Sequence, residues 1–83
     1  MDRNEAFAVL QSAAAETLSV EIDDVTEEAR FKEDLGADSL DLVEFVMALE
    51  ERLDIAVPEE DLDGITTVGQ ALDLVLSKLA AKA

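Results

Sequence analysis

The sequence predicts an all-α fold, a small four-helix bundle of three main helices and one short helix, with a long loop between helices 1 and 2. Apolar residues recur at helical spacing in three separate stretches, and no segment alternates with the period of a β-strand. The chain has 83 residues, of which 49% are hydrophobic, which is enough for one core. We therefore expect residues 1–83 to form a single domain.

The first helix is predicted over residues 3–18. Asp2 with Glu5 three positions later has the spacing of a capping box, in which the two side chains satisfy free amides at the helix start. Alanines at positions 13, 14 and 15 would let a neighbouring helix approach closely. The apolar stripe of this helix follows helical spacing: Phe7, Leu10, Ala14 and Leu18.

A long connection covers residues 19–37 and is rich in acids. Loops of this length are uncommon in compact domains unless they fold back on the core or serve a function. Gly36, near its end, suits a backbone of positive φ before the next helix. We expect its isolated apolar residues to hold the loop across the helices: Val20, Ile22, Val25, Phe31 and Leu35.

The second helix is predicted to start at Asp38 or Ser39 and to end near Leu53. Asp38 with Asp41 has the spacing of another capping box, so the two acids can cap this helix without Ser39. One apolar face is clear and consists of Leu42, Phe45, Val46, Leu49 and Leu53. A second apolar stripe begins beside Ser39 and consists of Leu40, Val43 and Met47.

Two further helices complete the predicted bundle. Pro58 suits the first position of a short helix that runs to Asp61 or Asp63. Thr67 with Gln70 three positions later has the spacing of a capping box that opens the last helix. The apolar stripe of that helix is Val68, Ala71, Leu72, Val75 and Leu79.

Composition excludes several functions. With 21 acids and six bases, the net charge of −15 should repel nucleic acid and anionic membranes, keep the protein monomeric and select partners with basic patches. The chain has no cysteine and no histidine, so it lacks a thiolate, a soft metal site and the usual general base, and we expect neither a metal site nor enzymatic activity. We find no signal peptide and no membrane-length apolar run, which predicts a soluble cytoplasmic protein.

Ser39 is the candidate for chemistry. A serine nucleophile needs a base, and Lys32 is the nearest one in sequence, but nothing indicates a formed Ser–Lys pair. Ser39 could instead help to begin the helix, or it could be a covalent attachment point. The second apolar stripe favours attachment, because an exposed strip edged by carboxylates suits docking by a cationic partner. Those carboxylates belong to Glu44, Glu50 and Glu51.

At these residues the chain resembles the acyl carrier proteins. Asp38-Ser39-Leu40 matches the attachment motif of that family. Four stretches follow its bacterial fatty-acid type: residues 31–41, 43–51, 57–60 and 65–68. The resemblance implies that a separate transferase esterifies Ser39 with 4′-phosphopantetheine, whose terminal thiol carries acyl groups as thioesters. A chain without cysteine fits a thiol that comes from the cofactor.

The resemblance also implies roles for residues around Ser39. Partner docking would fall to Asp34, Asp38, Leu40, Asp41, Val43, Glu44, Met47, Glu50 and Glu51. An acyl chamber between the helices would be lined by Leu42, Phe45, Val46, Leu49, Ile65, Ala71, Leu72 and Val75. Phe45 is bulkier than the aliphatic residue expected there, which would narrow or redirect the chamber.

The implied partners are a phosphopantetheinyl transferase and the acyltransferase, ketosynthase, reductase and dehydratase enzymes of fatty acid synthesis. Two alternatives stay open at this stage. The chain could serve a polyketide pathway, or it could be an acidic helical interaction module in which Ser39 is unmodified. An esterase using Ser39 is a more distant alternative.

Overall fold

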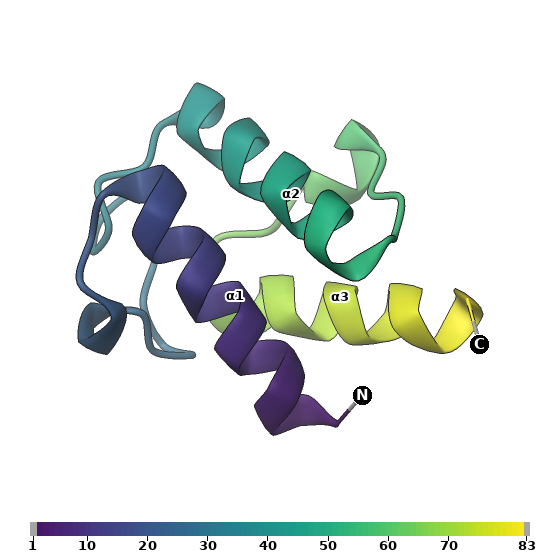
Figure 1. The fold of residues 1–83 in the computed structure, drawn as a ribbon. Coiled ribbons are helices and arrows are strands. Elements are labelled where there is room, and N and C mark those ends of the chain that lie inside the picture. The colour runs from purple at the N-terminus through teal and green to yellow at the C-terminus, as the bar shows by residue number, and fades with distance from the viewer. Residues whose placement is uncertain (1, 83) are drawn as a thin grey trace.

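The three main helices all form in the computed structural model, which describes residues 2–82 (Figure 1). The elements in chain order are α1 (Arg3–Leu18), the 3₁₀-helix η1 (Ile22–Asp24), α2 (Ser39–Leu53), the 3₁₀-helix η2 (Glu59–Leu62) and α3 (Val68–Lys82). The described residues contain no β-strand. The all-α prediction is confirmed, and the predicted short helix is the 3₁₀-helix η2.

Capping boxes begin α1 and α2, as the spacing of their acids predicts. In α2, the Asp41 amide donates to Asp38 Oδ1 at 2.9 Å, and the Asp38 amide donates to Asp41 Oδ2 at 3.3 Å. Asp2 and Glu5 form the equivalent pair at the start of α1. Each box satisfies amides that have no partner within the helix, which sets where the helix begins.

The core lies where α1 packs against both α2 and α3. Its largest fully buried side chains come from all three helices and include Leu10, Phe45, Leu49 and Leu72. Three alanines of α1 are also fully buried, so the neighbouring helices approach its backbone closely: Ala6, Ala13 and Ala14. On the predicted core face of α2, only Leu42 is half-buried, and it lies near the Ser39 end of the helix.

The long loop packs back on the core, as predicted, and is also tied to the start of α3. The Phe31 amide donates to the Thr66 carbonyl at 3.0 Å, and the Val68 amide donates to the Ala29 carbonyl at 2.9 Å. Val25, Phe31 and Leu35 are buried. The rings of Phe31 and Phe45 lie 5.4 Å apart, which fixes the loop against α2.

The prediction for Ile22 is wrong, because this side chain is 48% exposed. Ile22 begins η1, a single turn whose residues all face solvent. The turn carries the chain away from the core and returns it at Val25, which is fully buried. Val20 is half-buried against the core.

The connection from α2 to α3 contains η2, which starts one residue after the predicted position. Pro58 precedes η2 as its cap, with an extended backbone. Asp61 of η2 forms an ion pair with Lys78 of α3 at 2.7 Å, which ties the short helix to the last one. Thr67 Oγ1 then accepts a hydrogen bond from the Gln70 amide at 3.3 Å, as the predicted capping box requires.

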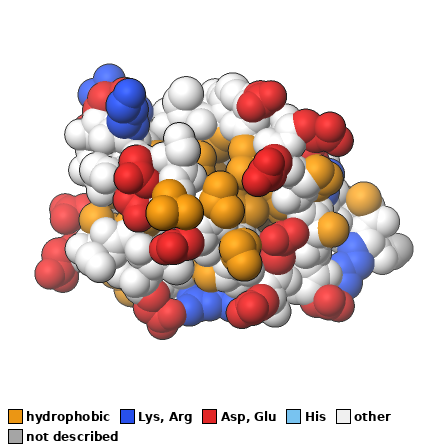
Figure 2. All heavy atoms as spheres, turned by 90° about the horizontal axis from the view of Figure 1, so that it is seen from above, with side chains coloured by type: hydrophobic (Ala, Val, Ile, Leu, Met, Phe, Trp, Pro, Cys, Tyr) orange, Lys and Arg blue, Asp and Glu red, His pale blue; other side chains and the backbone are white. Residues whose placement is uncertain are grey.

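The outer face of α2 carries an apolar patch among acids. Figure 2, which views the molecule from the side of α2, shows apolar side chains in the middle of the face with carboxylates around them. Leu40 and Met47 belong to the second predicted stripe and are 66% and 55% exposed. Val43, between them, is half-buried. Large apolar side chains that remain exposed on a small domain commonly mark a surface that contacts a partner.

Candidate functional site

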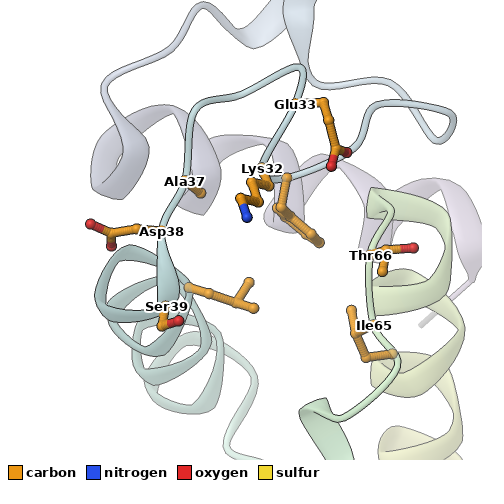
Figure 3. A pocket seen from close by; sticks show the side chains of 9 residues that line it. Lys32, Glu33, Ala37, Asp38, Ser39, Ile65 and Thr66 are labelled. Atoms are coloured by element: carbon orange, nitrogen blue, oxygen red, sulfur yellow. The ribbon is translucent and has the colours of Figure 1, made fainter.

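Ser39 is the first residue of α2 and lies at the edge of a groove of about 350 Å³ (Figure 3). Gly36 turns the chain just before it with a φ of 67°, as predicted. Asp38 and Asp41 cap the helix, so Ser39 stays exposed and its hydroxyl is not needed for the cap. The groove is lined by Phe31, Lys32, Glu33, Ala37, Asp38, Ser39, Leu42, Ile65 and Thr66.

The groove brings together three segments that are distant in the sequence. The loop around Phe31 forms one wall, the start of α2 forms a second, and Ile65 with Thr66 forms the third (Figure 3). The Asp38 carboxylate points away from the groove, whereas the Lys32 ammonium points into it. The groove therefore has apolar walls from Phe31, Leu42 and Ile65, and Lys32 is the one basic residue among those that line it, beside the acidic Glu33.

Asp34, a predicted docking acid, has a structural contact as well. Its carboxylate accepts a hydrogen bond from the Arg30 amide at 2.8 Å, and this bond is the main cause that lowers the pKa of Asp34 below 3.8. The Arg30 guanidinium, 3.4 Å away, lowers the pKa further. Asp34 therefore stabilises the turn that leads to Ser39 and still carries an exposed negative charge.

Glu50 is another predicted docking acid with an unpredicted internal partner. Its Oε2 accepts a hydrogen bond from the Val57 amide at 2.9 Å, which joins the end of α2 to the following loop. Glu44 and Glu51 are exposed. A second hollow of about 210 Å³ lies beside Met47 on this face and is lined by Val43, Val46, Met47, Glu50, Val57, Glu59 and Leu62.

The predicted chamber residues gather around a cavity between α2 and α3. The cavity is about 10 Å³, room for no more than about one water molecule. Of the predicted residues only Leu72 does not line it, because Leu72 lies about 100° around the helix from Ala71. The cavity is lined by Leu42, Phe45, Val46, Leu49, Val57, Leu62, Ile65, Ala71, Leu74 and Val75.

Three lining residues were missed from the sequence. Leu74 follows Ala71 by three positions, a helical spacing that could have identified it. Val57 and Leu62 flank or end η2, and only the folded connection brings them over the cavity. No local sequence pattern indicates that approach.

The described residues, 2–82, contain no cluster of three or more acids placed to hold a metal ion. No helix within this part of the chain is long and apolar enough to cross a membrane.

A small bundle of helices that presents an exposed serine at a helix start is typical of a carrier domain. A family model described as the phosphopantetheine attachment site matches residues 8–75. The chain is 47% identical over 81 residues to an acyl carrier protein of Rubrobacter xylanophilus, covering 98% of this chain and all of that protein. It is 46% identical over 80 residues to an acyl carrier protein of Saccharopolyspora erythraea, covering 96% and 84%.

The chain therefore belongs to the acyl carrier protein family, whose members carry their cargo and do not catalyse its conversion. Its prosthetic group is 4′-phosphopantetheine.

The residues beside Ser39 suit this group. Ester formation needs a reachable hydroxyl, which Ser39 provides, and the phosphate would lie next to the start of α2, where helix amides favour negative charge. The groove offers both polar side chains, such as Lys32 and Thr66, and apolar ones, such as Phe31 and Ile65, to the arm.

Proposed function

We propose that Ser39 is the attachment point of 4′-phosphopantetheine and that residues 1–83 act as an acyl carrier domain for fatty acid synthesis in the cytoplasm. One observation supports this most strongly. Ser39 is exposed at the edge of a 350 Å³ groove, while Asp38 and Asp41 alone cap the helix on which it lies. Residues 31–41 and 43–51 follow the bacterial fatty-acid type of the family, which favours fatty acid synthesis over a polyketide pathway.

Different residues of this chain would have separate roles in carrying the acyl group. When bound, the prosthetic group supplies the thiol that this cysteine-free chain lacks. Ser39 supplies the ester oxygen, and the capping box of Asp38 and Asp41 holds that oxygen at a fixed end of α2. Phe31, which packs on Phe45, gives the groove a rigid wall along which the arm can lie.

The outer face of α2 would dock the transferase and the acyltransferase, ketosynthase, reductase and dehydratase enzymes. Leu40 and Met47 offer exposed apolar contact, and Glu44 and Glu51 offer exposed negative charge beside it. Such an arrangement guides a basic partner and sets its orientation more than it adds affinity. Asp34, Asp38, Asp41, Val43 and Glu50 extend the same surface.

The cavity between α2 and α3 would shelter the acyl chain. Its present volume of about 10 Å³ is far too small for an acyl chain, so α2 and α3 would have to separate as the chain enters. Phe45 is fully buried and lines this cavity, so its ring would limit the length of chain that fits. Leu42 and Ile65 line both the groove and the cavity, so they lie between Ser39 and the interior.

An intact-mass measurement tests the attachment. The apo-protein is incubated with coenzyme A, magnesium and a broad-specificity phosphopantetheinyl transferase. We expect wild type to gain one phosphopantetheine and Ser39→Ala to gain none. Ser77→Ala, which changes an exposed serine of α3, is the matched control and should gain one.

Circular dichroism checks that each variant is helical. If wild type gained no mass, Ser39 would be unmodified and the chain would act as an acidic interaction module. If Ser39→Ala still gained the group, attachment would occur at another residue.

A further inference from the structure

Lys32 differs from every other basic residue of this chain. The sequence has six lysines and arginines, and five of them form ion pairs with carboxylates: Arg3, Arg30, Arg52, Lys78 and Lys82. Within residues 2–82, no carboxylate forms such a pair with Lys32. In a chain with 21 acids, a lysine without an acidic partner needs an explanation.

The backbone around Lys32 is held in place. The preceding Phe31 amide donates to the Thr66 carbonyl at 3.0 Å, and the Phe31 carbonyl accepts from the Ala37 amide at 2.8 Å. The Phe31 side chain is buried against Phe45. Lys32 is therefore a flexible side chain on a fixed base, and its ammonium points into the groove beside Ser39 (Figure 3).

Although the helix start favours a phosphate, the charged side chains around Ser39 other than Lys32 are acidic and disfavour it: Glu33, Asp38 and Asp41. A phosphodiester on Ser39 would add one negative charge between Asp38 and Asp41, in a chain whose net charge is already −15. Arg30 is near in sequence, but its guanidinium is paired with Glu33 and Asp34. Lys32 is the one cation among the residues that line the groove.

We infer that the Lys32 ammonium binds a non-bridging oxygen of the phosphodiester on Ser39 and so directs the arm along the groove toward Ile65. The inference rests on the proposed attachment at Ser39 and adds a positioning residue to it. An ammonium and a phosphate attract as opposite charges, and a lysine can follow the phosphate because its stem is flexible. Lys32 would hold the arm at rest and release it when a basic partner competes for the phosphate.

Nuclear magnetic resonance of the loaded protein tests this contact directly. The pKa of the Lys32 ammonium is measured in the apo- and the loaded protein through its side-chain nitrogen. A neighbouring anion favours the charged form of lysine, so we expect the pKa to be higher after loading. The ³¹P resonance of the phosphodiester is recorded in the same samples as a readout of the arm's order.

Three variants separate the contact from a general charge effect. Lys32→Gln should change the ³¹P chemical shift and narrow the line as the phosphodiester becomes more mobile. Lys32→Arg should retain the wild-type order because it keeps a cation. Arg30→Gln removes the same charge two residues away and should have the smaller effect on the resonance, because Arg30 does not line the groove and its guanidinium is paired with Glu33 and Asp34.

An unchanged Lys32 pKa on loading, or equal ³¹P effects of Lys32→Gln and Arg30→Gln, would overturn the inference. Circular dichroism of each variant excludes unfolding as the cause. A failure of the proposed attachment would show differently, as a protein with no added mass and no ³¹P signal.

Discussion

At the scale of single residues, the site depends on a division of roles around the start of α2. Asp38 and Asp41 satisfy each other's amides, which leaves Ser39 exposed at the first helical position. This part of the site could be predicted, because capping depends on residues three positions apart. The hydrogen bond from the Val57 amide to Glu50 could not be predicted, because it depends on how the loop after α2 turns back toward the helix.

Asp34 provides a residue-scale prediction about pH. The pKa of its carboxylate is lowered by the hydrogen bond from the Arg30 amide and by the Arg30 guanidinium. A lowered pKa means that the folded state favours the charged carboxylate. Its contribution to stability is therefore complete above the ordinary pKa of 3.8 and is lost as the pH falls through the lower, folded value. We expect Asp34→Asn to be less stable than wild type at pH 7 and this difference to shrink in acid.

Urea unfolding at a series of pH values measures the effect of Asp34→Asn. The variant also removes one of 21 acids, which by itself relieves repulsion. Glu28→Gln is the control for that relief, because Glu28 is exposed and forms no ion pair within residues 2–82. If Asp34→Asn and Glu28→Gln had the same stability at pH 7, the Arg30 contact would contribute nothing.

At the scale of elements, the helices and the loop differ in how far sequence determines them. The bounds of α1 and α2 follow from capping boxes and from apolar spacing within each helix, so both could be predicted to within a residue. The loop over residues 19–37 depends on contacts with α3, more than 30 residues away. Its burial could be expected from its apolar residues, but the outward turn at Ile22 could not.

The loop also completes the start of α3, which explains a glycine in that helix. The amides of Val68 and Gly69 donate to the carbonyls of Ala29 and Glu27, each at 2.9 Å. These first-turn amides have no partner within the helix, so the loop supplies their acceptors. A Cβ on Gly69 would lie 3.1 Å from the Glu27 carbonyl oxygen. A side chain at position 69 would therefore crowd the backbone of the loop, which glycine avoids.

This close approach makes Gly69→Ala an element-scale prediction. In a helix interior, replacing glycine with alanine usually gains about 1 kcal/mol, and Gly69, as the second residue of α3, would gain less than this. Here we expect a net loss of stability, because the new methyl group pushes the Glu27 carbonyl away from the Gly69 amide. Ser77→Ala, at an exposed position of the same helix, should instead gain up to about 0.5 kcal/mol. Thermal unfolding of both variants measures the difference. An increase in the stability of Gly69→Ala over wild type would show that the loop moves aside without loss of stability.

At the scale of the whole molecule, the net charge of −15 acts against folding and in favour of partner encounter. The seven ion pairs involve largely or partly exposed groups, and exposed pairs typically contribute about 0–1 kcal/mol each. Repulsion among the remaining acids extends across the molecule at low salt, because the screening length of about 30 Å at 10 mM matches its extents of 33 × 25 × 20 Å. At 0.1 M the screening length is about 10 Å, so the repulsion is confined to neighbouring acids. Salt should therefore weaken the repulsion and the attraction to basic partners together.

We expect opposite responses to sodium chloride between about 10 and 200 mM, the range in which the screening length falls from about 30 Å to below 10 Å. The melting temperature should rise, because repulsion among acids is screened more than the short ion pairs. The initial rate of phosphopantetheine transfer should fall, because encounter with a basic transferase loses its electrostatic guidance. Calorimetry and intact-mass time courses measure the two quantities.

The double variant Glu44→Gln, Glu51→Gln separates the docking face from the overall charge. Both side chains are exposed on α2, and together they supply two of the 21 acids. If this face guides the transferase, the variant should load more slowly at low salt and lose much of the salt dependence of loading. Its melting temperature should still rise with salt, because most of the repelling acids remain. An unchanged salt dependence of loading would place the guiding charges elsewhere on the molecule.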